Sequence, residues 1–134
     1  MSKYSQQAAI RSQISAAQSK KEGYLKKARE VKKIYEELRT IKGEFVKQKK
    51  SLNTKKNEHD DSWTGNLHNT KFITPAEDLI ENFDASIKAM NENIDKLLNK
   101  INEYENKAME QDGLIGQLGI LLNNISGWFE SLVN

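Results

Sequence analysis

Two heptad-spaced rows of apolar residues in the second half of the chain constrain its fold more than any other feature. One row contains Ile80, Ile87, Ile94, Ile101, Ala108, Ile115, Leu122 and Phe129. The other contains Phe83, Met90, Leu97, Tyr104, Gln111, Leu118, Ile125 and Leu132, and Gln111 is the single polar member of either row. This repeat predicts a long helix that packs against another helix as in a coiled coil.

The first half of the chain carries a matching row at seven-residue intervals, which contains Ile10, Ala17, Tyr24, Val31, Leu38, Phe45 and Leu52. The two halves differ in charge. Residues 1–58 hold 16 Lys and Arg against 6 Asp and Glu, whereas residues 59–134 hold 5 against 13. Oppositely charged helices attract each other, so we expect the two helices to pack together in antiparallel orientation.

The segment between the two helices contains Trp63, Gly65 and the only proline, Pro75. Proline suits the first turn of a helix, where its missing N–H costs nothing. We therefore predict an all-α fold, an elongated antiparallel two-helix hairpin with coiled-coil character, as a single domain of residues 1–134. The first helix is expected at about residues 5–56, a W-x-G bend at 57–74 and the second helix at about 75–111.

The C-terminal part of the chain differs in character from the rest. Residues 114–133 contain one charge, Glu130, and several large apolar residues outside the two rows, namely Leu114, Ile120, Leu121, Trp128 and Val133. A helix that is apolar on more than one face needs cover on more than one side, so we predict that residues 114–133 bind a partner. The glycines at 113, 116 and 119 leave open whether this segment continues the second helix, kinks it or forms a separate short helix.

The residues that support catalysis or ligand binding do not form any recognisable constellation in this sequence. There is no cysteine, the two histidines stand nine residues apart, and no P-loop or nucleophile–base pairing is visible. We therefore expect no enzyme activity, no cofactor, no metal and no small-molecule substrate. Nucleic acid is not expected either, because the acidic second helix should neutralise much of the field of the basic first helix. The first residues lack the apolar run of a signal peptide.

Two stretches carry a resemblance to a known family. The segment Trp63-Thr-Gly-Asn-Leu-His-Asn-Thr-Lys-Phe72 contains a W-x-G motif followed by a phenylalanine. Together with residues 101–118, it resembles the W-x-G superfamily of small helical-hairpin proteins of type VII (ESX-like) secretion in bacteria. It is most similar to the YwqH-like proteins encoded beside LXG toxins.

The resemblance implies a non-enzymatic, chaperone-like accessory or targeting partner. Such a protein binds the helical N-terminal domain of an LXG-type toxin, in some cases with a second small helical partner, and promotes its export by the type VII secretion machinery. It implies a location in the bacterial cytoplasm, and co-export to the cell surface or medium without a cleaved signal peptide stays open. The family's Tyr-x-x-x-Asp/Glu signal is absent here, since Ala108 follows Tyr104 four residues later. Recognition for export would then fall to the toxin or to another partner.

Two groups of residues are the predicted sites. The bend motif for recognition by the secretion machinery contains Trp63, Gly65 and Phe72. The partner-binding group contains Ile101, Tyr104, Ile115, Leu118, Leu122, Ile125, Trp128, Phe129 and Leu132. The alternative function is a membrane-interfacial or membrane-active helix at residues 113–133, to which Trp128 and Phe129 are suited. This segment lacks the Lys- and Arg-rich polar face that binds anionic lipid.

Overall fold

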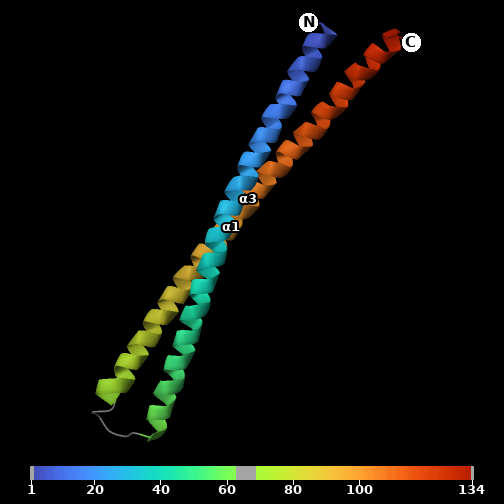
Figure 1. Cartoon of the computed structure of the whole chain (residues 1–134). Coiled ribbons are helices and arrows are strands. Elements are labelled where there is room, and N and C mark those ends of the chain that lie inside the picture. Colours follow the sequence, from blue (N-terminus) through green and yellow to red (C-terminus); the bar gives the residue numbers. More distant parts are fainter. Residues whose placement is uncertain (1, 63–68, 134) are drawn as a thin grey trace. The chain divides into compact units, whose positions relative to one another are not determined.

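The computed structural model describes residues 2–62 and 69–133, and the side-chain surroundings of residues 2–58 and 71–127. It contains two long helices, α1 (Lys3–Ser62) and α3 (Thr74–Val133), and a short π-helical turn, η1 (Asn69–Ile73) (Figure 1). The described part of the chain has no β-strand. The predicted all-α helical hairpin is therefore confirmed, and the W-x-G motif at residues 63–65 lies outside the described residues.

Both helices extend further than their expected bounds. α3 begins at Thr74, next to the predicted start at Pro75, whereas α1 continues past residue 56 to Ser62. The residues that follow Lys56 are polar, but none of them up to Ser62 is a glycine or a proline. A polar run ends the apolar row without ending the helix, because the backbone of these residues remains compatible with helical geometry.

The hairpin divides into two units, and each joins one stretch of α1 to one stretch of α3. The terminal unit contains the residues up to Val31 and those from Asn99 onward. Here Gln7 Nε2 donates a hydrogen bond to Ser126 Oγ at 3.2 Å, and Lys21 Nζ pairs with Asp112 Oδ1 at 2.8 Å. Two heptads forward along α1 thus correspond to two heptads back along α3, so the segments are antiparallel.

The middle unit, Lys32–Leu98, has its own antiparallel pairing. Lys49 pairs with Asp84, and one heptad further along α1, Lys56 Nζ lies 3.7 Å from Glu77 Oε1. The rings of Phe45 and Phe83 meet edge to face with their centroids 5.7 Å apart. The charge difference between the two halves of the sequence therefore appears as ion pairs between α1 and α3.

The two predicted rows face the partner helix within each unit. In the terminal unit the buried row members are Ala17, Ile101, Ala108 and Leu118, and Ala28, beside the row of α1, is also buried. In the middle unit Ile73 and Ala76 are buried, one heptad before Ile80 and Phe83, the first members of the two rows. The remaining row members with described side chains are half-buried. Two helices present one contact surface to each other and cannot enclose a core from all sides, which leaves much of each row partly exposed.

α3 is a single helix through Gly113, Gly116 and Gly119, so it includes the segment that the sequence left open. Glycine weakens a helix because it loses more backbone freedom on folding than any other residue. Ile115, Leu118 and Leu122 lie between and beside the glycines, and each is buried or half-buried against α1. Packing of these side chains offsets the low helix propensity of the glycines.

Replacing Gly113 and Gly116 by alanine is expected to stabilise the hairpin. A Cβ atom at either position would meet nothing within 4 Å. Each exchange should raise the free energy of unfolding by about 1 kcal/mol, as alanine for glycine does in exposed helices. Urea unfolding followed by circular dichroism measures the change, with Gln117→Ala as a control of small expected effect. A lower midpoint for the double variant would contradict a regular helix at these positions.

Candidate protein-binding face

Most of the predicted partner-binding residues contact α1 of the same chain. Ile101 and Leu118 are buried, and Tyr104, Ile115, Leu122 and Ile125 are half-buried. Tyr104 stacks on Tyr24 of α1 with ring centroids 6.5 Å apart. The hairpin itself therefore covers much of the apolar surface of these residues.

The structure describes only some of the other predicted site residues. Phe72 lies in η1 and is half-buried. Trp63 and Gly65 of the bend motif lie outside the described residues, as do the side chains of Trp128, Phe129 and Leu132. Their expected roles stay predictions.

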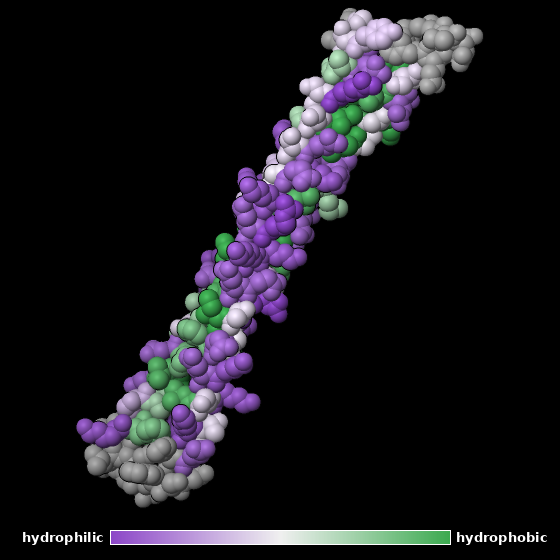
Figure 2. Space-filling model, in the orientation of Figure 1, coloured by the Kyte–Doolittle hydropathy of each residue, from purple (hydrophilic) through white to green (hydrophobic). Residues whose placement is uncertain are grey.

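The exposed apolar surface of the terminal unit comes from residues beside the rows. Leu114 is 42% exposed, Ile120 62% and Leu121 50%. They belong to the uncharged segment of α3, residues 113–127, which follows Asp112 and contains no charged side chain. Apolar residues are visible on the surface of this unit in Figure 2. The off-row positions of these three residues signalled this exposure in the sequence, whereas exposed Met109 was not singled out.

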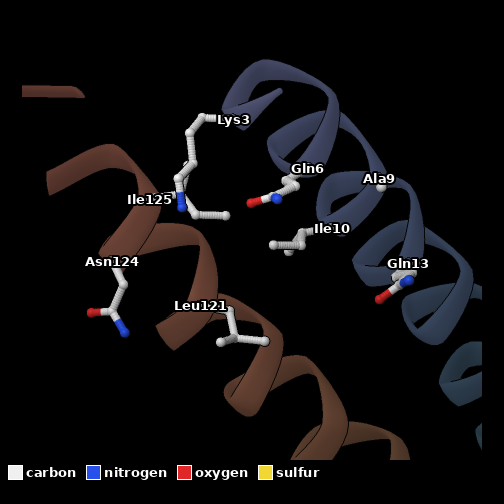
Figure 3. A pocket seen from close by; sticks show the side chains of 8 residues that line it. All are labelled: Lys3, Gln6, Ala9, Ile10, Gln13, Leu121, Asn124 and Ile125. Carbon is white, nitrogen blue, oxygen red and sulfur yellow. The ribbon is translucent and has the colours of Figure 1, made fainter. Parts of the chain in front are cut away.

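Leu114 and Leu121 also line an open groove between α1 and α3, which we call the terminal groove. Its wider part has a volume of about 650 Å³ and its narrower part about 210 Å³, and the two adjoin at Gln13. In the wider part, Ile10 of α1 and Leu121 of α3 lie on opposite sides of the space (Figure 3). The remaining lining residues are Lys3, Gln6, Ala9, Asn124 and Ile125 in the wider part, and Ala16, Ala17, Lys20, Gln111, Leu114 and Leu118 in the narrower part.

The opposite flank of the terminal unit is bridged by polar contacts. The Gln7–Ser126 hydrogen bond and the Lys21–Asp112 ion pair both join α1 to α3 on this side. The hydrogen bond with the Asp112 carboxylate, and its charge, raise the pKa of Lys21. The two flanks of the unit therefore differ: one is joined by side-chain pairs and the other is open.

A group of lysines lies beside the stacked Tyr24 and Tyr104, inward of the residues that line the terminal groove. Lys27 Nζ lies 5.7 Å, Lys100 Nζ 5.1 Å and Lys107 Nζ 5.9 Å from the centre of the Tyr104 ring, within range of cation–π attraction. Glu103 pairs with Lys107 at 3.2 Å and with Lys100 at 3.3 Å. Hydrogen bonds from these two lysines lower the pKa of Glu103, and the bond to Glu103 raises the pKa of Lys107. Of these three lysines, Lys27 is the one that does not pair with Glu103.

Comparison with known proteins does not assign this chain to a family. No family model matches the chain, and neither a curated protein nor a solved structure is significantly similar to it. Among the described residues, no group of His, Cys, Asp and Glu side chains could hold a metal ion. No helix in that part of the chain combines the length and the apolar character that crossing a membrane requires.

Proposed function

We propose that this chain is a protein-binding helical hairpin that acts as an accessory partner of an LXG-type toxin. It binds the toxin's helical N-terminal domain in the bacterial cytoplasm and promotes its export by type VII secretion machinery. The observation that carries the binding role is the exposed apolar surface of Leu114, Ile120 and Leu121 in a segment without charges. The class of partner rests on the W-x-G resemblance.

Protein binding accounts for this surface because apolar side chains gain free energy when a partner removes them from water. Complete burial of a leucine or isoleucine contributes about 1.5–3 kcal/mol relative to leaving it exposed. Leu114, Ile120 and Leu121 retain about half of their surface, so burial of all three would contribute on the order of 3 kcal/mol. Half-buried row members such as Ile125 can add to this total. Association costs lower the net gain, so the partner must contact several residues at once.

Co-purification with the toxin domain tests the proposal. The helical N-terminal domain of the LXG toxin encoded beside this gene, tagged and co-expressed, should retain the wild-type chain through affinity and size-exclusion steps. Leu114→Asp places a charge on the binding surface, so the affinity should fall by about tenfold or more. Isothermal titration with the separated proteins measures the change.

Leu98→Asp is the matched control, since Leu98 lies on α3 in the middle unit and is 41% exposed. It should bind as tightly as the wild type. Circular dichroism of each variant checks that helicity is retained. Absence of any complex with the wild-type chain would refute the toxin-partner role, and retention on liposomes instead would support the membrane-interfacial alternative.

A further inference from the structure

We propose that the terminal groove binds one helix of another protein, and that this helix is apolar over most of its contact face and acidic where it reaches Lys20 and Lys27. The inference rests on the proposed function in that it concerns the mode of partner binding. It adds which flank of the hairpin is used, what the partner presents there and at which end of the groove its acidic side chains lie.

The two flanks of the terminal unit differ, and only the open flank is suited to binding a partner helix. On one side, α1 and α3 are joined by the Gln7–Ser126 hydrogen bond and the Lys21–Asp112 ion pair. A partner approaching there would meet polar groups that already have partners. On the other side, the groove places Ile10, Leu114 and Leu121 along one open channel, where another side chain can contact both helices.

The dimensions of the groove fit a helix. Its α1 edge extends from Lys3 to Lys20, which corresponds to about 26 Å at 1.5 Å per residue. A partner helix of about five turns would cover this length, and about two further turns would bring it to Lys27. The two heptad-spaced leucines, Leu114 and Leu121, match the spacing at which one face of such a helix repeats.

The residues along the α1 edge give the chemistry of the occupant. From Lys3 inward, the edge carries the neutral residues Gln6, Ala9, Gln13 and Ala16, followed by Lys20. One heptad further on lies Lys27. The alanines at 9 and 16 let another helix approach closely, whereas Lys20 and Lys27 favour acidic side chains at its inner end.

A second copy of this chain does not meet these requirements in a symmetric dimer. A two-fold axis brings the same surface of both copies together. Each groove would then face another groove, and the residues that line a groove include lysines but no Asp or Glu. The occupant is therefore a helix from a different protein.

Two designed peptides test the groove without the toxin. Each has about three heptads with leucine at the a and d positions and alanine or glutamine elsewhere. The last heptad carries glutamates in one peptide and lysines in the other. Fluorescence anisotropy with the full chain, at concentrations below peptide self-association, should show about tenfold tighter binding of the glutamate peptide. Equal affinity for the two peptides, or no saturable binding, would overturn the proposal.

Variants of the full chain locate the binding site. Leu121→Asp should weaken binding of the glutamate peptide about tenfold, and Lys20→Glu should reverse the preference between the two peptides. Met109→Asp is the matched control, because Met109 is an exposed apolar residue of α3 in the same unit and does not line the groove. It should leave the affinity unchanged. If Leu121→Asp reduces helicity in circular dichroism, Leu121→Gln replaces it in the same measurement.

The outcomes separate this inference from the proposed function. If the toxin domain does not bind but the peptides behave as expected, the groove proposal is supported and the toxin-partner role is refuted. If the toxin domain binds and its affinity is unaffected by Leu121→Asp and Lys20→Glu, the groove proposal is overturned while the partner role stands. Sensitivity to Met109→Asp alone, or a dimer of the chain that Leu121→Asp dissociates, would likewise overturn it.

Discussion

Replacing Ile101 with aspartate is expected to unfold the terminal unit. Ile101 is 5% exposed and lies in the apolar row of α3 that packs on α1. A carboxylate at this position would lose its hydration without a built-in partner, and an unpaired buried charge is among the few single changes that cost about 4 kcal/mol or more. Since small domains are stable by about 5–15 kcal/mol in total, this loss should remove most of the stability.

Circular dichroism at 222 nm during urea titration measures the effect. Ile101→Ala should cost less, about 2–4 kcal/mol, because it removes packing without adding a charge. Leu98→Asp introduces the same charge three residues earlier on an exposed side chain, so it should shift the unfolding midpoint little. Similar midpoints for Ile101→Asp and Leu98→Asp would show that Ile101 is not part of the core.

Replacing Gln111 with leucine is expected to stabilise the hairpin. Gln111 is the polar exception in the apolar rows, and its Oε1 atom is buried without a hydrogen-bond donor among the residues whose side chains are described. A buried acceptor without a donor costs about 1–3 kcal/mol, and leucine removes this cost while it adds apolar contacts beside Ala17 and Leu118. The free energy of unfolding should therefore rise by about 1–3 kcal/mol.

Thermal and urea unfolding of Gln111→Leu give this difference directly. Gln117→Leu is the matched control, since Gln117 is exposed on the same helix and the exchange buries little new surface. It should change the midpoint only slightly. A lower midpoint for Gln111→Leu than for the wild type would show that the amide contributes a hydrogen bond in solution.

The heptad rows made most of the fold predictable from the sequence. A spacing of seven residues places side chains on one face of a helix whatever the rest of the chain does, so the buried positions of Ile101, Ala108 and Leu118 followed from periodicity alone. The charge difference between the halves predicted antiparallel pairing, which the contacts Lys21–Asp112 and Lys49–Asp84 confirm. The partner's class came from the W-x-G resemblance and stays a proposal.

The sequence indicated less clearly that several lysines of α1 lie against α3. Lys21, Lys49 and Lys56 occupy positions that face the partner helix, although their residue type suggested a solvent-exposed face. A lysine can lie along an apolar contact because its hydrocarbon stem packs there while its ammonium group reaches an acid at the edge. Which acid it reaches depends on the register between helices.

Periodicity by itself thus determined two helices and their contact faces, and the charge difference between the halves predicted their antiparallel pairing. The tertiary structure alone decided which flank of the terminal unit is bridged and which is open. That asymmetry depends on pairs such as Gln7 and Ser126, which stand 119 residues apart in the sequence. A local repeat specifies the direction of each side chain on its own helix, whereas the neighbours of that side chain across the hairpin are fixed only when both helices pack in one register.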